Sequence, residues 1–211
     1  MEAAVTNDRY TLVDNGGALK SPRLIGAQLG ITVRQEINHI FLETGLLKKY
    51  YFNAVAFRGA DVYGINNAFN AWLIPLRFGT KINLYKEKLL LVPMVGYSFC
   101  IDSDYGHDSA GRGETRSNSS TATFTYQGNN SVAKHFPLLQ TGIGLECKLF
   151  SSMLLTLSSN YYTGLKKVYE MDIQYTIDGG APVEATAISK GDFFNVSVGV
   201  KYSISSLWGK N

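Results

Sequence analysis

Alternation of apolar and polar residues along seven stretches of the chain is the feature that most limits its fold. In residues 138–150, LLQTGIGLECKLF, nearly every second residue is apolar, and the residues between are mostly glycine, glutamine and single charges. Successive side chains of a β-strand point to opposite faces, so a period of two predicts strands. The same period recurs in residues 23–35, 40–52, 71–79, 88–101, 153–164 and 193–204. The sequence therefore predicts an all-β fold.

The connections between these stretches alternate in length. EINH, TKINLYKE and FSS are short and turn-like, whereas residues 53–69, 102–134 and 165–192 are long and rich in Gly, Asn, Ser and Asp. Short turns at one end and long loops at the other are typical of transmembrane β-barrels. The predicted strands also match the roughly 9–11 residues that a tilted strand needs to cross a bilayer.

A hairpin is predicted within the third long loop. Residues 169–177 alternate again, and Asp178-Gly179-Gly180 supplies residues that tolerate the positive φ of a tight turn. We expect this hairpin to project beyond the barrel wall rather than to join it, and residues 120–128 to form a second, smaller projection.

The number of strands in an up-and-down barrel with both ends on the short-turn side must be even. Seven stretches are visible, so an eighth strand is expected upstream, and residues 3–13 are the candidate, although their alternation is poor. We therefore predict an N-terminal segment, residues 1–22, that holds a weak or truncated first strand. We also predict an eight-stranded antiparallel barrel over residues 23–204 and a C-terminal tail over residues 205–211.

The polar side of the predicted strands indicates which face of the wall points outward. Charged residues make up 18% of the chain, below the roughly 25% of soluble domains, and the polar side is mainly Gly, Ser, Thr, Asn and Gln. Such small side chains suit the narrow interior of an eight-stranded barrel. We therefore expect the apolar side to face lipid. A soluble, lipocalin-like binding barrel, with its apolar side inside, is the alternative.

Aromatic residues near the strand ends are predicted to form two girdles at the membrane interfaces. Those toward the long loops are Tyr50, Tyr51, Trp72, Tyr97, Phe99, Tyr161 and Phe193. Those toward the short turns are Phe41, Phe78, Tyr85, Phe150 and Tyr202.

Composition excludes several other classes of protein. The net charge of +3 is small and mixed, which gives no footprint for nucleic acid. Cys100 and Cys147 are expected about ten steps of about 3.3 Å apart on neighbouring strands, too far for a disulfide. No apolar run approaches the roughly 18 residues of a membrane-spanning helix. The start, MEAAVTNDRY, lacks the apolar region of a secretory signal, so an exported chain would be a mature form or a fragment.

Five charged residues are expected on the inner side of the wall near the short turns: Arg34, Glu43, Arg77, Glu146 and Lys201. Because buried charges need partners, we predict that they form a layer of ion pairs and hydrogen bonds that plugs the lower barrel. Such a layer is either a static plug or the gate of a narrow pore.

Catalytic and metal chemistry have few candidates in this sequence. A lipid hydrolase would need a histidine, a serine and an acid together, and His135 with Ser98 or Ser158 is the available set. Residues 102–108, DSDYGHD, contain three aspartates and a histidine but lack the spacing of an EF-hand. We expect no catalytic residues, no metal and no cofactor.

Over about residues 23–204 the chain resembles the small outer-membrane β-barrel proteins of Bacteroidota, which are related in shape to OmpA and OmpX barrels. The strand sequences that carry the resemblance are FLETGLLKKYY, WLIPLRFG, LLVPMVGYSF, LLQTGIGLECKLF, LSSNYYTGL and FFNVSVGVKYS. The resemblance implies an eight-stranded barrel in the outer membrane of a Gram-negative bacterium, with turns in the periplasm and loops outside the cell. Outer-membrane lipid and, during insertion, the assembly machinery would be its partners. The poorly matched first strand and the tail SSLWGKN depart from the family pattern.

The function expected from these observations is that of a non-enzymatic membrane scaffold. It would present residues 53–69, 102–134 and 165–192 for adhesion or for contact with an extracellular or periplasmic protein partner or a ligand. A lipid A or phospholipid hydrolase and an accessory subunit of a secretion system are the alternatives. A wide porin channel is not expected, because eight strands leave too narrow a lumen.

Overall fold

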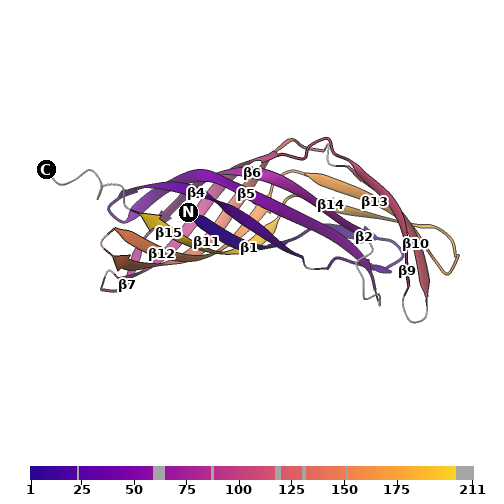
Figure 1. Cartoon of the computed structure of the whole chain (residues 1–211), viewed down its shortest axis with the longest axis horizontal. Helices are drawn as coiled ribbons and strands as arrows, with labels where there is room; N and C mark the ends of the chain where they lie inside the picture. The colour runs from indigo at the N-terminus through magenta and orange to yellow at the C-terminus, as the bar shows by residue number, and fades with distance from the viewer. Residues whose placement is uncertain are drawn as a thin grey trace.

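The computed structural model describes residues 1–22, 24–58, 65–86, 88–116, 120–129, 132–150 and 152–202. Fifteen strands lie within these ranges and form two main sheets, a barrel at the left of Figure 1 and a smaller sheet at the right. Among the described residues no helix is long and apolar enough to span a membrane. The expected tail, residues 205–211, lies outside the described residues.

Eight antiparallel strands form the closed wall of the barrel. They pair in the order β1-β4-β5-β6-β8-β11-β12-β15, and β15 pairs back with β1. Their bounds are β1 Glu2–Asp8, β4 Ile25–Ile37, β5 Ile40–Phe57, β6 Ile65–Thr80, β8 Leu89–Asp102, β11 His135–Phe150, β12 Met153–Gly164 and β15 Phe193–Tyr202. The predicted eight-stranded antiparallel barrel is confirmed.

The eighth strand is β1, and it closes the wall. It pairs with β15 on one side, from Glu2↔Gly199 to Asp8↔Phe193, and with β4 on the other. Its sequence, EAAVTND, places two alanines and an asparagine among its alternating positions. The strand therefore shows little contrast between its two faces, which explains why its alternation is poor.

The wall is apolar outside and polar inside. Ile143 and Val198 are 50% and 52% exposed, whereas Gln140 and Ser197, on the same strands, are 1% and 6% exposed. This orientation is the reverse of a lipocalin-like barrel, so that alternative is wrong. An outward apolar surface on a wall without edges is the arrangement that a bilayer requires of strands.

The aromatic girdles are present in part. Tyr50, Trp72, Tyr97 and Phe99 are exposed on the outside toward the long connections, and Phe78, Tyr85, Phe150 and Tyr202 are exposed toward the short turns. Three of the expected girdle residues, Phe41, Tyr51 and Phe193, are instead buried inside the barrel. Each lies next in sequence to an outward residue, and consecutive side chains of a strand point to opposite faces.

A second sheet, which we call the cap sheet, stands beyond the long-connection end of the barrel (Figure 1). Its order is β2-β14-β13-β10-β9. The strands are β2 Thr11–Asp14, β9 Ser109–Arg116, β10 Thr121–Asn129, β13 Tyr169–Ile177 and β14 Val183–Ser189. Two short strands extend the barrel sheet locally: β3 Leu19–Lys20 pairs with the end of β5, and β7 Ile82–Tyr85 pairs with β8.

The connections expected to be long loops are therefore largely strands. The predicted hairpin forms β13 and β14 and lies outside the wall, and residues 120–128 fall on β10. The cap sheet arises because β10 pairs with β13, which joins two hairpins that lie far apart in the sequence. Strands β5 and β6 also extend beyond the expected residues 40–52 and 71–79, to Phe57 and from Ile65.

The outward position of Val198 gives a direct test of the membrane-facing surface. Val198 lies in the middle of β15, and replacing it by Lys should lower the free energy of unfolding by about 2–4 kcal/mol in phospholipid vesicles, because lipid cannot solvate the charge. Denaturant titration followed by tryptophan fluorescence measures this change.

Val13→Lys is the matched control, because Val13 on the cap sheet is also 52% exposed but lies outside the barrel wall. That variant should change stability by less than about 0.5 kcal/mol. Equal effects of the two substitutions would show that the wall does not face lipid.

Candidate functional site

The inner side of the barrel brings together the five charged residues predicted to line it. Antiparallel pairing places Arg34 opposite Glu43 and Glu43 opposite Arg77, on three consecutive wall strands. Glu146 comes from β11 and Lys201 from β15. Directly opposed residues share a face, so this register turns Arg34, Glu43 and Arg77 inward together. Lys201 reaches both Glu43 and Glu146 across the same space.

Two carboxylates bridge the three cations of this cluster. Glu43 accepts hydrogen bonds from Arg34 Nε at 2.9 Å and from Arg77 Nη1 at 2.9 Å. Lys201 Nζ lies 2.8 Å from a Glu43 oxygen and 3.0 Å from Glu146 Oε1. Arg34 Nη1 donates to the same Glu146 oxygen at 2.7 Å. Each buried charge therefore has at least one partner of opposite sign, as burial requires.

Glu2 is a sixth member of this layer that the sequence did not reveal. Its carboxylate accepts two hydrogen bonds from Arg77, at 2.8 Å from Nη1 and 3.0 Å from Nη2. With Glu2 the layer holds three acids and three bases, so its formal charges balance. Glu2 lies in the weakly alternating first strand, where no pattern assigned it to the inner side.

A chain of hydrogen-bonded amide side chains lies next to the charged layer. Gln140 donates to Asn160 at 2.9 Å, Asn160 donates to Asn195 at 3.0 Å, and Asn195 donates to Gln28 at 2.9 Å. Arg77 Nε joins this chain of amides to the charges by donating to Gln140 at 3.1 Å. An amide carries both donors and an acceptor, so these side chains connect β11, β12, β15 and β4 through consecutive hydrogen bonds.

A buried lysine and aromatic rings fill the lumen toward the cap. Lys49 Nζ lies 2.6 Å from Asp8 Oδ1, and it stands 4.1 Å and 5.0 Å from the ring centroids of Tyr51 and Phe193. Phe193 in turn stacks on Tyr162, with ring centroids 4.2 Å apart. The sequence pair Lys48-Lys49 splits between the two faces, because Lys48 points outward over Trp72.

The side chains of these layers are buried within the barrel. Arg77, Gln140, Lys49 and Tyr162, which represent the successive layers, are each 3% exposed or less. A static plug is the arrangement that this burial favours; whether the layer opens stays a prediction.

The residues considered for catalysis are not brought together. His135 is exposed on the outer side of β11 and stacks on Phe99, with ring centroids 5.6 Å apart. Ser98 is buried on the inner side, and Ser158 also points inward, where it shares a 2.6 Å hydrogen bond with Ser197. The wall therefore separates the histidine from both serines.

The aspartate-rich stretch 102–108 forms a turn at the end of β8. Asp104 accepts hydrogen bonds from Asn70 N at 2.7 Å and Asn70 Nδ2 at 2.9 Å, which fixes this turn against β6. Within the described ranges no group of three or more His, Cys, Asp or Glu residues is placed to hold a metal ion. Both cysteines are free thiols.

The cap is continuous with the filled lumen. Tyr51 stacks on Phe69 at 4.5 Å between ring centroids, and Phe69 stacks on Tyr169 of β13 at 6.2 Å. Further out, Phe57 at the end of β5 contacts Tyr175 of β13, with centroids 5.5 Å apart. One buried cluster thus runs from the mouth of the barrel to the inner face of the cap sheet.

A hydrogen-bonded carboxylate fastens the edge strand β2 to this core. Asp14 accepts from Tyr175 Oη at 2.7 Å and from the backbone amides of Leu19 at 2.7 Å and Gly16 at 3.0 Å. Burial would raise the pKa of Asp14, but these hydrogen bonds outweigh it and lower the pKa. Burial and the contact with Asp14 raise the pKa of Tyr175 to about 12.

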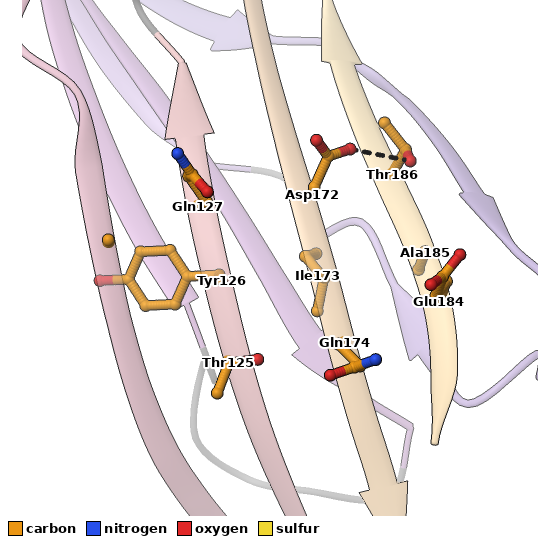
Figure 2. Close-up of a pocket in the computed structure, with 10 residues that line it drawn as sticks. Thr125, Tyr126, Gln127, Asp172, Ile173, Gln174, Glu184, Ala185 and Thr186 are labelled. Carbon is orange, nitrogen blue, oxygen red and sulfur yellow. Dashed lines mark hydrogen bonds between the residues drawn. The ribbon is translucent and has the colours of Figure 1, made fainter. Parts of the chain in front are cut away.

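The outer face of the cap sheet is polar and open. Figure 2 shows Thr125, Gln127, Asp172, Gln174, Glu184 and Thr186 side by side on β10, β13 and β14, around a shallow depression. Thr186 Oγ1 donates to Asp172 Oδ1 at 3.2 Å. Antiparallel pairs bring these side chains together, for example Thr125 opposite Gln174 and Gln174 opposite Glu184. The result is a regular surface of hydroxyl, amide and carboxylate groups.

Comparison with known proteins yields similar structures only. No family model matches the sequence, and no curated protein is similar to it. A major outer membrane protein from Thermus thermophilus is 11% identical over 95% of this chain and 97% of its own, with a TM-score of 0.45. The transport unit of the autotransporter AIDA-I from Escherichia coli is 12% identical over 96% and 89%, with a TM-score of 0.30. The resemblance to Bacteroidota barrels stays a prediction.

Removal of the Glu43 carboxylate tests the charged layer. Glu43→Gln leaves Arg34, Arg77 and Lys201 short of a counter-charge in a buried space, so we expect a loss of about 3–5 kcal/mol in unfolding free energy. Glu170→Gln is the control, because Glu170 pairs with Lys167 on the exposed cap at 2.8 Å and should contribute less than about 1 kcal/mol. Similar losses for both variants, measured by denaturant titration, would contradict a buried network.

Acid should loosen β2 from the cap. Because the folded pKa of Asp14 is lowered, its contribution to stability is present above the unfolded pKa and is lost as the pH falls through the folded pKa. Hydrogen exchange measures this loosening. In acid, the backbone amides of β2 and of Leu19 should lose more protection from exchange than the backbone amides of β13. Asp14→Asn should reduce this protection at neutral pH and remove its acid dependence, whereas Asp172→Asn should leave it unchanged.

Proposed function

We propose that this protein is a non-enzymatic outer-membrane scaffold that holds a rigid cap sheet outside the cell for contact with a partner protein or ligand. The barrel anchors the chain, its lumen is closed, and the polar outer face of the cap sheet is the contact surface. The observation that carries the proposal is the single buried cluster that joins the lumen to the inner face of the cap sheet.

The buried cluster supports display of a surface because it fixes the cap to the membrane anchor. A flexible loop would lose conformational entropy on binding, whereas a sheet braced by stacked rings such as Tyr51, Phe69 and Tyr169 is already ordered. The closed lumen argues against transport as the main role. A hydrolase would need His135 next to Ser98 or Ser158, and the barrel wall separates the histidine from both serines.

The features of the wall support a membrane location. Its outer surface is apolar between two sets of exposed aromatic residues, and Lys48 extends over Trp72 and Tyr50 at the end nearer the cap. Aromatic rings and long cationic side chains are favoured at the level of lipid headgroups. Placement of the cap outside the cell follows the general arrangement of such barrels, with short turns in the periplasm and larger connections outside.

Epitope insertion tests the location of the cap. A tag inserted at the Asp178-Gly179 turn of the cap should be labelled by antibody on intact cells, because this turn is exposed and lies between β13 and β14. A tag at the Asn38-His39 turn between β4 and β5 is the matched control, and it should be labelled only after the outer membrane is permeabilised. Labelling of the second tag alone on intact cells would overturn the proposed orientation.

Conductance of the purified protein in planar bilayers tests the closed lumen. The wild type should give no steady channel, because the lumen is filled by side chains that are almost fully buried. A stable ohmic current from folded protein would favour a pore and count against the scaffold.

A further inference from the structure

The outer edge of β9 ends the cap sheet. β9 pairs with β10 on one side, and no described strand pairs with its other side. A sheet edge presents backbone N–H and C=O groups that can pair with another strand. The opposite edge, β2, has four residues, whereas β9 has eight.

β9 lacks most of the devices by which natural proteins block edge pairing. Its sequence, SAGRGETR, contains no proline, and its register with β10 runs without a bulge from Gly128↔Ser109 to Thr121↔Arg116. Its charged residues Arg112, Glu114 and Arg116 point to the exposed face rather than inward. The edge therefore has neither proline nor a bulge, and its outward charges are what restrict pairing with it.

Two glycines keep the inner face of this edge flat. A Cβ on Gly111 would lie 2.7 Å from the Tyr126 ring, and a Cβ on Gly113 would lie 2.6 Å from the Phe124 ring. These rings of β10 therefore cover the glycines, an arrangement that supports glycine-containing edge strands. A strand that pairs with β9 would therefore lie beside Gly111 and Gly113, whose inner face the Tyr126 and Phe124 rings cover.

We propose that the edge of β9 pairs with β9 of a second copy of this chain, antiparallel and with Gly113 opposite Gly113. In this register Arg112 of each copy faces Glu114 of the other, so two ion pairs form across the joint, beside the 2.8 Å pair that Glu114 makes with Arg116 of its own chain. Directly opposed charges of opposite sign favour strand pairing, and like charges oppose it. The inference names a partner for the proposed display surface and rests on the cap lying clear of the membrane.

Charge pattern and overlap together select this register, because an axis at Thr115 would pair Glu114 with Arg116 but would overlap only three residues of β9. A two-fold axis at Glu114 would oppose Glu114 to Glu114 and Arg112 to Arg116, and an axis at Arg112 would oppose Arg112 to Arg112. An axis at Gly111 shortens the overlap and forms neither ion pair. The Gly113 register also overlaps seven residues of each β9, from Ala110 to Arg116, within the strand's bounds.

Disulfide capture of the full chain in detergent tests the register. On a Cys147→Ser background, Ala110→Cys with Arg116→Cys in one chain should form a covalent dimer on oxidation, because these positions face each other across the joint. Neither substitution alone should form a covalent dimer. The same position in the two copies would lie six residues apart along the strands, which is about 20 Å at about 3.3 Å for each residue. An equal mixture of the two single variants should cross-link. Absence of cross-linking in the double variant, or equal cross-linking of either single variant by itself, would overturn the proposal.

Charge reversal tests the ion pairs without cysteines. Glu114→Arg should lower the dimer fraction, measured by sedimentation over a range of protein concentrations, by about tenfold or more in association constant, and Arg112→Glu with Glu114→Arg should restore it. Folding of each variant is checked by the heat-dependent shift of barrel mobility in gels. Dimerisation unaffected by Glu114→Arg would overturn the proposal. Because these assays use purified protein, their failure is distinguishable from failure of the epitope test, which concerns the location of the cap.

Discussion

Hydrocarbon around the wall cannot form hydrogen bonds, and this constraint governs the rest of the structure. Every backbone polar group of a spanning strand must be paired within the sheet, so the sheet must close on itself. Closure here depends on β1, which pairs with both β4 and β15. The same constraint sends the apolar side chains outward and leaves the polar ones to satisfy each other inside.

The inner network follows from strand parity combined with the small radius of an eight-stranded barrel. Side chains from all around the wall meet near the axis, so Arg77 reaches Glu2 on β1, Glu43 on β5 and Gln140 on β11. A wider barrel would leave such groups to water. In this eight-stranded barrel, charges, amides and aromatic rings occupy successive layers along the lumen. The aromatic layer is nearest the cap sheet and is continuous with its buried face.

The sequence predicted the wall well because period-two alternation is a local signal. Seven strands, their sidedness and the inward direction of Arg34, Glu43, Arg77, Glu146 and Lys201 could all be derived from it. Glu2 and Asp8 were missed because β1 has little contrast between its faces. Lys49, the partner of Asp8, lies on β5, where parity places it inside. Phe41, Tyr51 and Phe193 were assigned to the wrong face because aromatic content near a strand end was weighed above parity. The cap sheet depends on pairing between β10 and β13, which no local pattern encodes.

The seam between β1 and β15 has a consequence for how the barrel can be built. The amino group of Met1 donates to the Val200 carbonyl at 2.9 Å, so the first and last wall strands are immediate neighbours. A short peptide could therefore join them, and the backbone could be cut at Asp178-Gly179 in the cap. Such a circular permutant would keep every wall pairing while making the seam a covalent hairpin. In the natural order, the wall cannot close until its last strand has arrived.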